Sequence, residues 1–245
     1  GTVYHAVLEN FAGKLAESNL TWWDFTEDFA AKAVKESVEA YAAIYGETVL
    51  YSSARNEYAI TRMSRILTRT VLTLQKHLKQ GSFQPDDYKS GNRKFDLAAL
   101  YYGLQLQLVV YMNAAMEMES RKHPDKEIVP AALLYYHIDD PTIETPVELT
   151  DEQINEQILA KLRMNGVVNS DPGVVERLDR YMQDKSVVIP VEKKKDGSFS
   201  ARSGVLSREE MQLISSYVDA KIRSIGREIL DGKIAANPYE KGNEE

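Results

Sequence analysis

The clearest candidate for chemistry in this sequence of 245 residues is the motif Asp87-Tyr88-Lys89-Ser90-Gly91. Asp87 and Lys89 are separated by one residue, so on a β-strand their side chains would project to the same face. The carboxylate could bind a divalent cation, and the ammonium could stabilise the negative charge that develops when a phosphodiester is hydrolysed. Asp-x-Lys is a common pattern, however, and in isolation it is most often a solvated surface turn.

Three further residues could support such a site. His5 is next to the apolar positions Val3 and Val7 of a predicted helix, where it is either a core residue or a metal ligand. Gln107 and Tyr111 are four residues apart, so they share a helix face. They either contact a DNA backbone and support the site, or belong to an amphipathic helix with a buried tyrosine.

A row of basic residues recurs at helical spacing in front of the Asp-x-Lys motif. Such a row could follow a phosphate backbone, or it could be the solvated face of a helix, and the spacing favours neither. The pair Asp139 and Asp140 could supply carboxylates, although capping of a helix or turn is the favoured role. The basic residues are Arg62, Arg65, Arg69, Lys76 and Lys79.

Composition and missing motifs exclude several classes of protein. The net charge of −7 argues against a passive DNA-coating protein, which would be basic, but an enzyme needs only a local basic path. The chain has no cysteine, so it forms no disulfide or thiolate metal site, and we expect a reducing, cytoplasmic compartment. It contains no Walker-type phosphate loop, dinucleotide fingerprint or His-Glu-x-x-His site. No apolar run approaches the roughly 20 residues that span a bilayer, so we expect no membrane association.

Hydrophobic periodicity predicts a mainly helical chain with few strands. Helices are expected over 3–15, 26–45, 54–80 and 96–115, and capping boxes open two more over 150–165 and 207–232. The apolar run 129–138 predicts a buried strand, and 186–199 predicts a hairpin with an Asp-Gly turn. The chain does not begin with Met, so we expect it to be part of a longer protein.

The order of the motifs is more specific than any one of them. Gly1-Thr2-Val3-Tyr4-His5, then Asp87-Tyr88-Lys89, then Gln107-Leu108-Val109-Val110-Tyr111 resembles the RecB-type branch of the PD-(D/E)XK nucleases. Longer strings look like the C-terminal nuclease domain of the AddB family, whose members are subunits of bacterial ATP-dependent helicase/deoxyribonucleases. Those strings are Lys94-Phe95-Asp96-Leu97, Tyr101-Tyr102-Gly103-Leu104-Gln105-Leu106-Gln107, Tyr136-His137-Ile138-Asp139-Asp140-Pro141 and Ile234-Ala235-Ala236-Asn237-Pro238-Tyr239.

The resemblance covers nearly the whole chain and implies a fold, an activity and a site. The fold would be α/β, a small mixed sheet flanked by helices with large helical additions, in a single nuclease domain over 1–245. His5 and Asp87 would bind Mg²⁺, Lys89 would be the catalytic lysine, and Gln107 and Tyr111 would contact DNA or support the site. The implied activity is exonuclease cleavage of the 5′-ended single strand released by a helicase. The implied process is double-strand-break repair by recombination, together with an AddA-type subunit.

Two features depart from the family. The family holds a 4Fe-4S cluster with four cysteines, which this chain lacks. The family also has several dozen residues of strands before the Asp-x-Lys motif, including a Gly-x-x-Asp-Arg-x-Asp motif that supplies a further acidic ligand. Here Phe83-Gln84-Pro85-Asp86 leads directly into Asp87. We therefore expect a segment to be missing between 81 and 87, because the strand of Asp87 would otherwise be an unpaired edge.

Two alternatives to the nuclease follow from these departures. The first is a catalytically inactive module of the same fold that guides DNA or assembles subunits. The second is a metal-independent helical scaffold whose motif matches are accidental.

Overall fold

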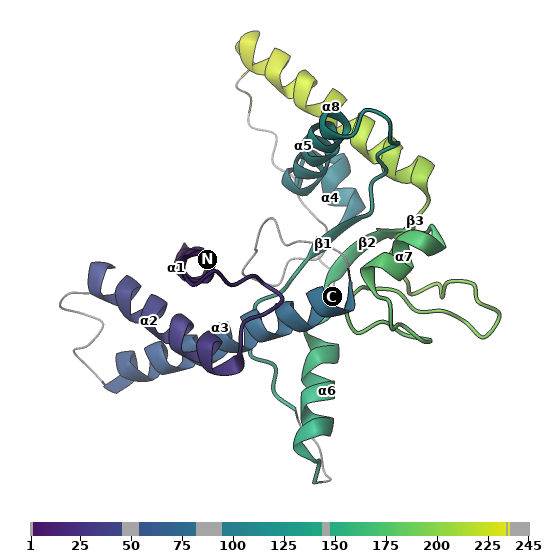
Figure 1. The fold of residues 1–245 in the computed structure, drawn as a ribbon. Helices are drawn as coiled ribbons and strands as arrows, with labels where there is room; N and C mark the ends of the chain where they lie inside the picture. Colours follow the sequence, from purple (N-terminus) through teal and green to yellow (C-terminus); the bar gives the residue numbers. More distant parts are fainter. Residues whose placement is uncertain (1, 46–53, 82–94, 144–147, 234, 236–245) are drawn as a thin grey trace, which may run out of the picture.

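The computed structural model describes residues 2–45, 54–81, 95–143, 148–233 and 235. Helices surround a small central sheet (Figure 1). None of the helices in these ranges is both long and apolar enough to cross a membrane. In chain order the elements are α1 (Thr2–Glu17), α2 (Glu27–Tyr45), α3 (Ala54–Gln80), α4 (Leu97–Tyr101), α5 (Gln107–Lys122), β1 (Ala132–Tyr135), α6 (Asp151–Lys161), β2 (Asn165–Asn169), α7 (Pro172–Leu178), β3 (Val205–Leu206) and α8 (Arg208–Leu230).

The sheet is mixed and has the order β1-β2-β3. β1 and β2 are antiparallel, with Leu133 opposite Val167, and β2 and β3 are parallel, with Val168 opposite Val205. A three-stranded mixed sheet flanked by helices confirms the predicted α/β class.

Each face of the sheet contributes to a different hydrophobic core. Leu133 and its cross-strand partner Val167 point into a smaller core with α4, α5 and α8. Val168 points the other way, into a larger core with α1, α2 and α3, because successive strand residues face opposite sides. Figure 1 shows these two groups of helices lying apart, with the strands between them. The fully buried side chains of the larger core include Val7, Leu8, Phe11, Val34, Leu67, Val188 and Ile189.

Two glycines allow the close approach of backbones beside β2. Gly166 has φ +139°, and a Cβ there would lie 2.0 Å from the carbonyl oxygen of Leu133. A Cβ on Gly204 would lie 2.2 Å from the carbonyl oxygen of Gly166. Both contacts are with main-chain atoms that cannot rotate away, so any larger residue at either position would displace a strand.

The predicted helix starts are confirmed in detail. At α4, Asp96 Oδ1 accepts hydrogen bonds from the N–H groups of the following turn. At α6 and α8 both bonds of a capping box form, between Thr150 and Gln153 and between Ser207 and Glu210. These side chains satisfy backbone donors that have no partner within the helix. The bounds of α1, α2 and α3 also agree with the hydrophobic periodicity.

The fourth predicted helix is wrong as a single element, because the chain breaks between α4 and α5. Leu104 N donates to Ala99 O and Gly103 N donates to Leu100 O, which is the Schellman pattern of a helix end. Gly103 has φ +87°, and Gln105 follows with φ 55°. The apolar periodicity continued across this turn, and Gly103 was the signal that should have ended the helix.

Two other predictions need correction. The helix from Thr150 ends at Lys161 rather than near 165, because Asn165–Asn169 pairs with β1 as β2, a strand that we did not predict. In the predicted hairpin the Asp-Gly turn is present, with Gly197 at φ +83°, but its arms meet only at the bridge between Lys193 and Phe199. Val188, Ile189 and Val191 instead enter the larger core, whereas Val187 is exposed.

One titratable side chain lies deep inside the larger half of the molecule. His77 of α3 is 1% exposed, and neither ring nitrogen has a hydrogen-bond partner among the described residues. Its ring packs edge-on against Tyr136, with the centroids 6.0 Å apart. Burial strips water from the charged imidazolium and lowers the pKa of His77 from 6.5 to about 4. The folded state therefore holds this imidazole neutral.

We expect this histidine to make the protein acid-sensitive. The pKa of His77 is lower in the folded state, so as the pH falls the unfolded state binds the proton first. Protonation of His77 therefore costs no unfolding free energy above pH 6.5, and the unfolding free energy declines as the pH falls from 6.5 toward 4. Between pH 7 and pH 5 the wild type should lose about 2 kcal/mol more unfolding free energy than His77→Leu. Urea denaturation at both pH values measures this. His123→Leu, at an exposed site, should keep the wild-type loss, and equal losses in wild type and His77→Leu would contradict the account.

Candidate functional site

The residues of the predicted metal site are only partly within the described structure. Asp87 and Lys89 lie outside the described residues. His5 lies near the start of α1 and is half-buried. Among the described residues no group of three or more histidine, aspartate or glutamate side chains could hold a metal ion. The predicted ligand pair of His5 and Asp87 therefore stays a prediction.

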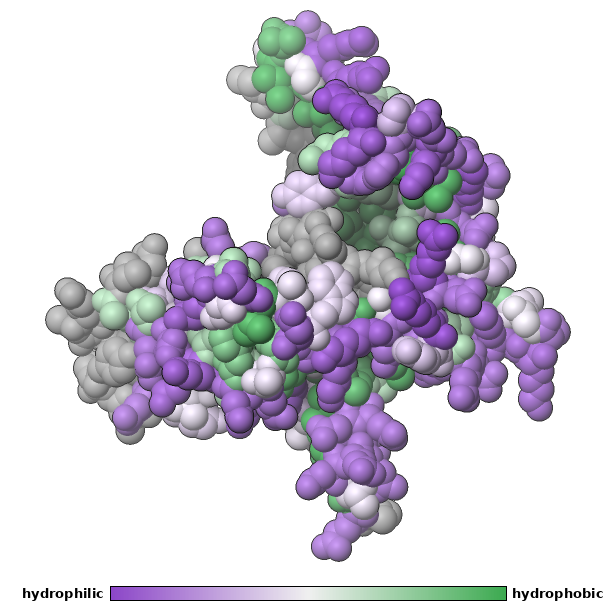
Figure 2. All heavy atoms as spheres, viewed as in Figure 1, coloured by the Kyte–Doolittle hydropathy of each residue, from purple (hydrophilic) through white to green (hydrophobic). Residues whose placement is uncertain are grey.

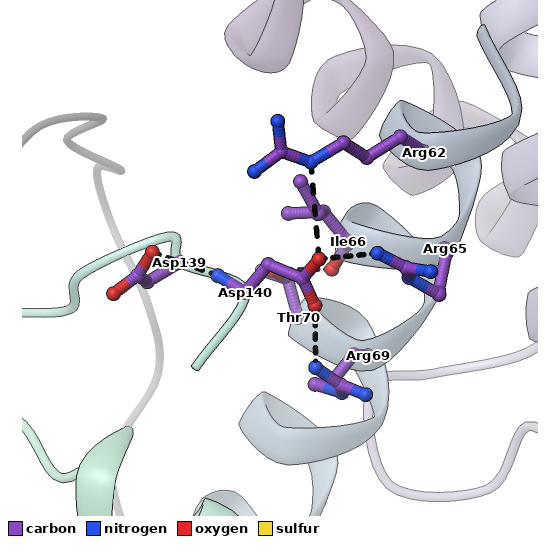
Figure 3. A network of polar contacts seen from close by, with 7 residues as sticks. All are labelled: Arg62, Arg65, Ile66, Arg69, Thr70, Asp139 and Asp140. Atoms are coloured by element: carbon purple, nitrogen blue, oxygen red, sulfur yellow. Dashed lines mark hydrogen bonds and ion pairs between the residues drawn. The ribbon is translucent and has the colours of Figure 1, made fainter. Parts of the chain in front are cut away.

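The carboxylate of Asp140 lies among the arginines of α3 (Figure 3). Arg65 Nη2 lies 2.5 Å from Oδ2 and Arg69 Nη1 lies 2.7 Å from Oδ1. Arg62 Nε forms a longer ion pair with Oδ2, at 3.9 Å. Both carboxylate oxygens thus accept charge-assisted hydrogen bonds, and the side chain is only 14% exposed.

Two elements bring these groups together. The arginines are three and four residues apart on α3, so they share one face of that helix. The chain leaving β1 passes α3 with Tyr136 and Ile138 buried in the larger core, which directs Asp140 toward this face. Asp139 Oδ1 accepts the N–H of Asp140 at 2.8 Å.

The structure separates the roles of the two aspartates. The predicted role of a helix or turn cap is wrong for Asp140, whose carboxylate binds arginines instead, whereas Asp139 accepts the N–H of its neighbour. Sequence reasoning missed this contact, although a row of arginines with no acidic residue at helical spacing was a signal that a partner would come from elsewhere in the chain. Among the described residues only the carboxylate of Asp140 pairs with these three arginines, so the described cluster keeps a net positive charge.

The same face of α3 borders a cavity of about 810 Å³ between α2, α3 and α6. Basic side chains line it, including Arg65, Arg69 and Lys76, but acidic ones line it as well, including Glu39 and Glu57. Its remaining walls are apolar or carry hydroxyl or amide groups. Because the charges are mixed, the cavity lacks the one-sided positive potential of a phosphate-binding groove.

Gln107 and Tyr111 form a second, separate group on α5. Gln107 Nε2 donates a hydrogen bond to Tyr111 Oη, and both side chains are exposed. Tyr111 is 44% exposed, so it is not the buried tyrosine of an ordinary amphipathic helix. The pair faces solvent from the side of the sheet that carries the smaller core, whereas His5 and the arginines lie on helices of the larger core.

Comparison with known proteins assigns the family. The model of the PD-(D/E)XK nuclease superfamily matches residues 78–243. This chain belongs to that superfamily. The match includes Asp87, Lys89, Gln107 and Tyr111, and it begins after His5 and the three arginines of α3.

Relatives match over the full length of the chain. Proteins named as a subunit of the ATP-dependent helicase/deoxyribonuclease are 36% identical in Lachnoclostridium phytofermentans, 31% in Clostridium acetobutylicum and 32% in Clostridioides difficile. The alignments cover 99%, 100% and 98% of this nuclease-superfamily chain and 25% of each relative. The chain therefore spans about a quarter of the length of these relatives.

The alignment lengths show that this superfamily member is shorter than the matching part of its relatives. The alignment with the Clostridium acetobutylicum protein runs over 292 positions, 47 more than the 245 residues of the chain. At least that many positions of the relative have no counterpart here. The segment that we expected to be missing between 81 and 87 stays a prediction.

We expect Asp140→Asn to destabilise the protein, because it leaves the arginines of α3 facing one another without a carboxylate. The loss in unfolding free energy should be about 1–2 kcal/mol in low salt, since Arg62 and Arg65 are largely exposed, and smaller in 1 M salt. Chemical denaturation measures it. Asp139→Asn is the matched control, because it removes a neighbouring carboxylate that pairs with no arginine of the described ranges. Equal stability of the two variants at low salt would contradict the role given to Asp140.

Proposed function

We propose that this chain is the metal-dependent deoxyribonuclease domain of a helicase-nuclease that processes the ends of DNA double-strand breaks for recombinational repair. The observation that carries the proposal is the superfamily match over 78–243, which spans Asp87, Lys89, Gln107 and Tyr111 in the order of the family's motifs. The names of the relatives, each a helicase/deoxyribonuclease subunit, support the same function.

Each proposed site residue has a role that suits its chemistry. Asp87 and His5 bind Mg²⁺, which in such sites activates water and neutralises charge on the phosphate. Lys89 donates to the phosphate oxygen on which negative charge develops. The exposed amide and hydroxyl of Gln107 and Tyr111 contact the DNA backbone or support the site, and their mutual hydrogen bond holds both side chains in one orientation.

The names of the relatives support a DNA substrate, a helicase activity and assembly with another subunit. By the family resemblance, the proposed substrate is single-stranded DNA produced by unwinding, the proposed cleavage is that of an exonuclease, and the proposed partner is an AddA-type subunit that supplies the motor. Without cysteine, the chain itself cannot hold the family's iron–sulphur cluster. Arg62, Arg65 and Arg69 keep a net positive charge after pairing with Asp140, which allows a secondary contact with a phosphate backbone.

One observation favours the second candidate function, an inactive module that guides DNA or assembles subunits. The relatives have at least 47 positions without a counterpart in this chain. If those positions include the additional acidic ligand of the family, Asp87 and His5 alone would hold the metal weakly. DNA would then be bound but not cut.

The test is digestion of a labelled single-stranded oligonucleotide by the purified chain in Mg²⁺. We expect cleavage that stops in EDTA and falls on the order of a hundredfold or more in Lys89→Ala and in Asp87→Asn, because each removes a group that stabilises the transition state. Rates come from product bands on a denaturing gel.

Asp86→Asn is the matched control for this assay, because on the predicted strand neighbouring residues would face opposite sides and we expect Asp86 to lie outside the proposed site. It should cut as fast as the wild type. Binding without cleavage would replace the enzyme with the inactive module. Cleavage that persists in EDTA and in Lys89→Ala would rule out the proposed site.

A further inference from the structure

Two large aromatic side chains stand in solvent where α4 ends. Tyr101 is 61% exposed and Tyr102 is 58% exposed. The ring of Tyr101 stacks on that of Tyr217 from α8, with centroids 5.8 Å apart and planes 11° from parallel. Tyr102 meets Tyr101 edge-on, with centroids 5.3 Å apart. One face of Tyr101 is therefore covered, and more than half of each residue's surface is open.

The backbone that carries these rings is anchored to α8. Tyr217 Oη donates a hydrogen bond of 2.5 Å to the carbonyl oxygen of Tyr101, which ties α4 to α8. α8 is tied in turn to α5, because Asn113 bonds both Ser215 and Asp219. An aromatic surface that is already ordered loses little conformational entropy when a flat ligand stacks on it.

A cation lies beside this aromatic surface. Lys221 is one helical turn after Tyr217 on α8, and its Cε would be 3.2 Å from a Cβ placed on Gly103. The lysine stem thus crosses the turn that directly follows the two tyrosines. Within the described part of the chain Lys221 makes no ion pair, so its charge is available to an anion.

We propose that Tyr101, Tyr102 and Lys221 form a binding site for single-stranded nucleic acid, in which unpaired bases stack on the rings and a phosphate pairs with the lysine. The proposal rests on the proposed function for its substrate and adds a subsite made of residues other than those proposed for the metal site. Exposed aromatic rings next to a cation are the features by which proteins hold unpaired bases without reading their sequence.

Another protein is the competing occupant. Apolar side chains gather at the C-terminal end of α8, where Ile229 is 69% exposed and Leu230 is 88% exposed (Figure 2). That end is aliphatic, whereas the surface at Tyr101 and Tyr102 consists of rings with polar hydroxyls and a neighbouring ammonium. The charge and the ring faces favour nucleic acid at the tyrosines, and we commit to it.

The test measures binding apart from cleavage. Fluorescence anisotropy of a labelled oligodeoxythymidylate of about 15 nucleotides is recorded in EDTA, with the full 245-residue chain. Tyr101→Ala/Tyr102→Ala should weaken binding by roughly tenfold to a hundredfold. Tyr101→Phe/Tyr102→Phe, which keeps both rings, should bind like the wild type. A blunt duplex of the same length has no unpaired bases, and its affinity should not differ between these variants.

Control variants separate stacking from a change in folding. Tyr102→Ala alone leaves the contact of Tyr101 with Tyr217 intact and should still weaken binding severalfold. Tyr181→Ala removes a tyrosine that is 73% exposed on a distant turn, and it should have no effect. Lys221→Gln should reduce the slope of log affinity against log salt by about 0.7, the value for one phosphate contact, and Lys221→Arg should restore it.

The outcomes are distinct. Unchanged affinity in the folded alanine variants overturns the site. Unchanged affinity together with loss of a dimer, seen as a change in mass by light scattering, would assign the surface to protein contact and also overturn it. If wild type binds but never cuts, and the alanine variants bind weakly, the binding site stands while the nuclease proposal fails.

Discussion

The antiparallel pairing of β1 with β2 is the interaction on which the rest of the structure depends. The two faces of this strand pair belong to different cores. Leu133 and Val167 point toward α4, α5 and α8, and Val168 points toward α1, α2 and α3. The pairing requires Gly166, since a Cβ there would meet the carbonyl oxygen of Leu133. The short ladder between β1 and β2 therefore joins two groups of helices that share few other contacts.

This arrangement distributes the candidate functional groups over both sides of the sheet. The larger side carries His5 and the arginine cluster, and Asp140 binds that cluster to the chain leaving β1. The smaller side carries the solvent-facing pair Gln107 and Tyr111 and the tyrosines at the end of α4. A nucleic acid that contacted the residues on both sides would have to pass the edge of the sheet. Such binding would therefore depend on the relative position of the two cores.

Sequence patterns predicted the structural features that form from local contacts. They failed for the features that depend on contacts between residues far apart in the sequence. The helices α1, α2 and α3 follow from apolar spacing, and the capping boxes at Thr150 and Ser207 follow from side chains that bond within one turn. β2 was missed because five residues around Gly166 have no strand signal without their partner β1. Asp140 was assigned to a turn because its arginines are about seventy residues away in sequence. Motif order identified the family, but the segment with Asp87 and Lys89 lies outside the described residues.

Native-state hydrogen exchange tests most directly whether one sheet couples both cores. Amides of α3 in the larger core and of α8 in the smaller core should open with the same free energy in the wild type. Gly166→Ala should lower both values by the same amount, because it disturbs the layer that the cores share. Loss of protection in one core with unchanged protection in the other would contradict this coupling and would show that the two halves fold independently.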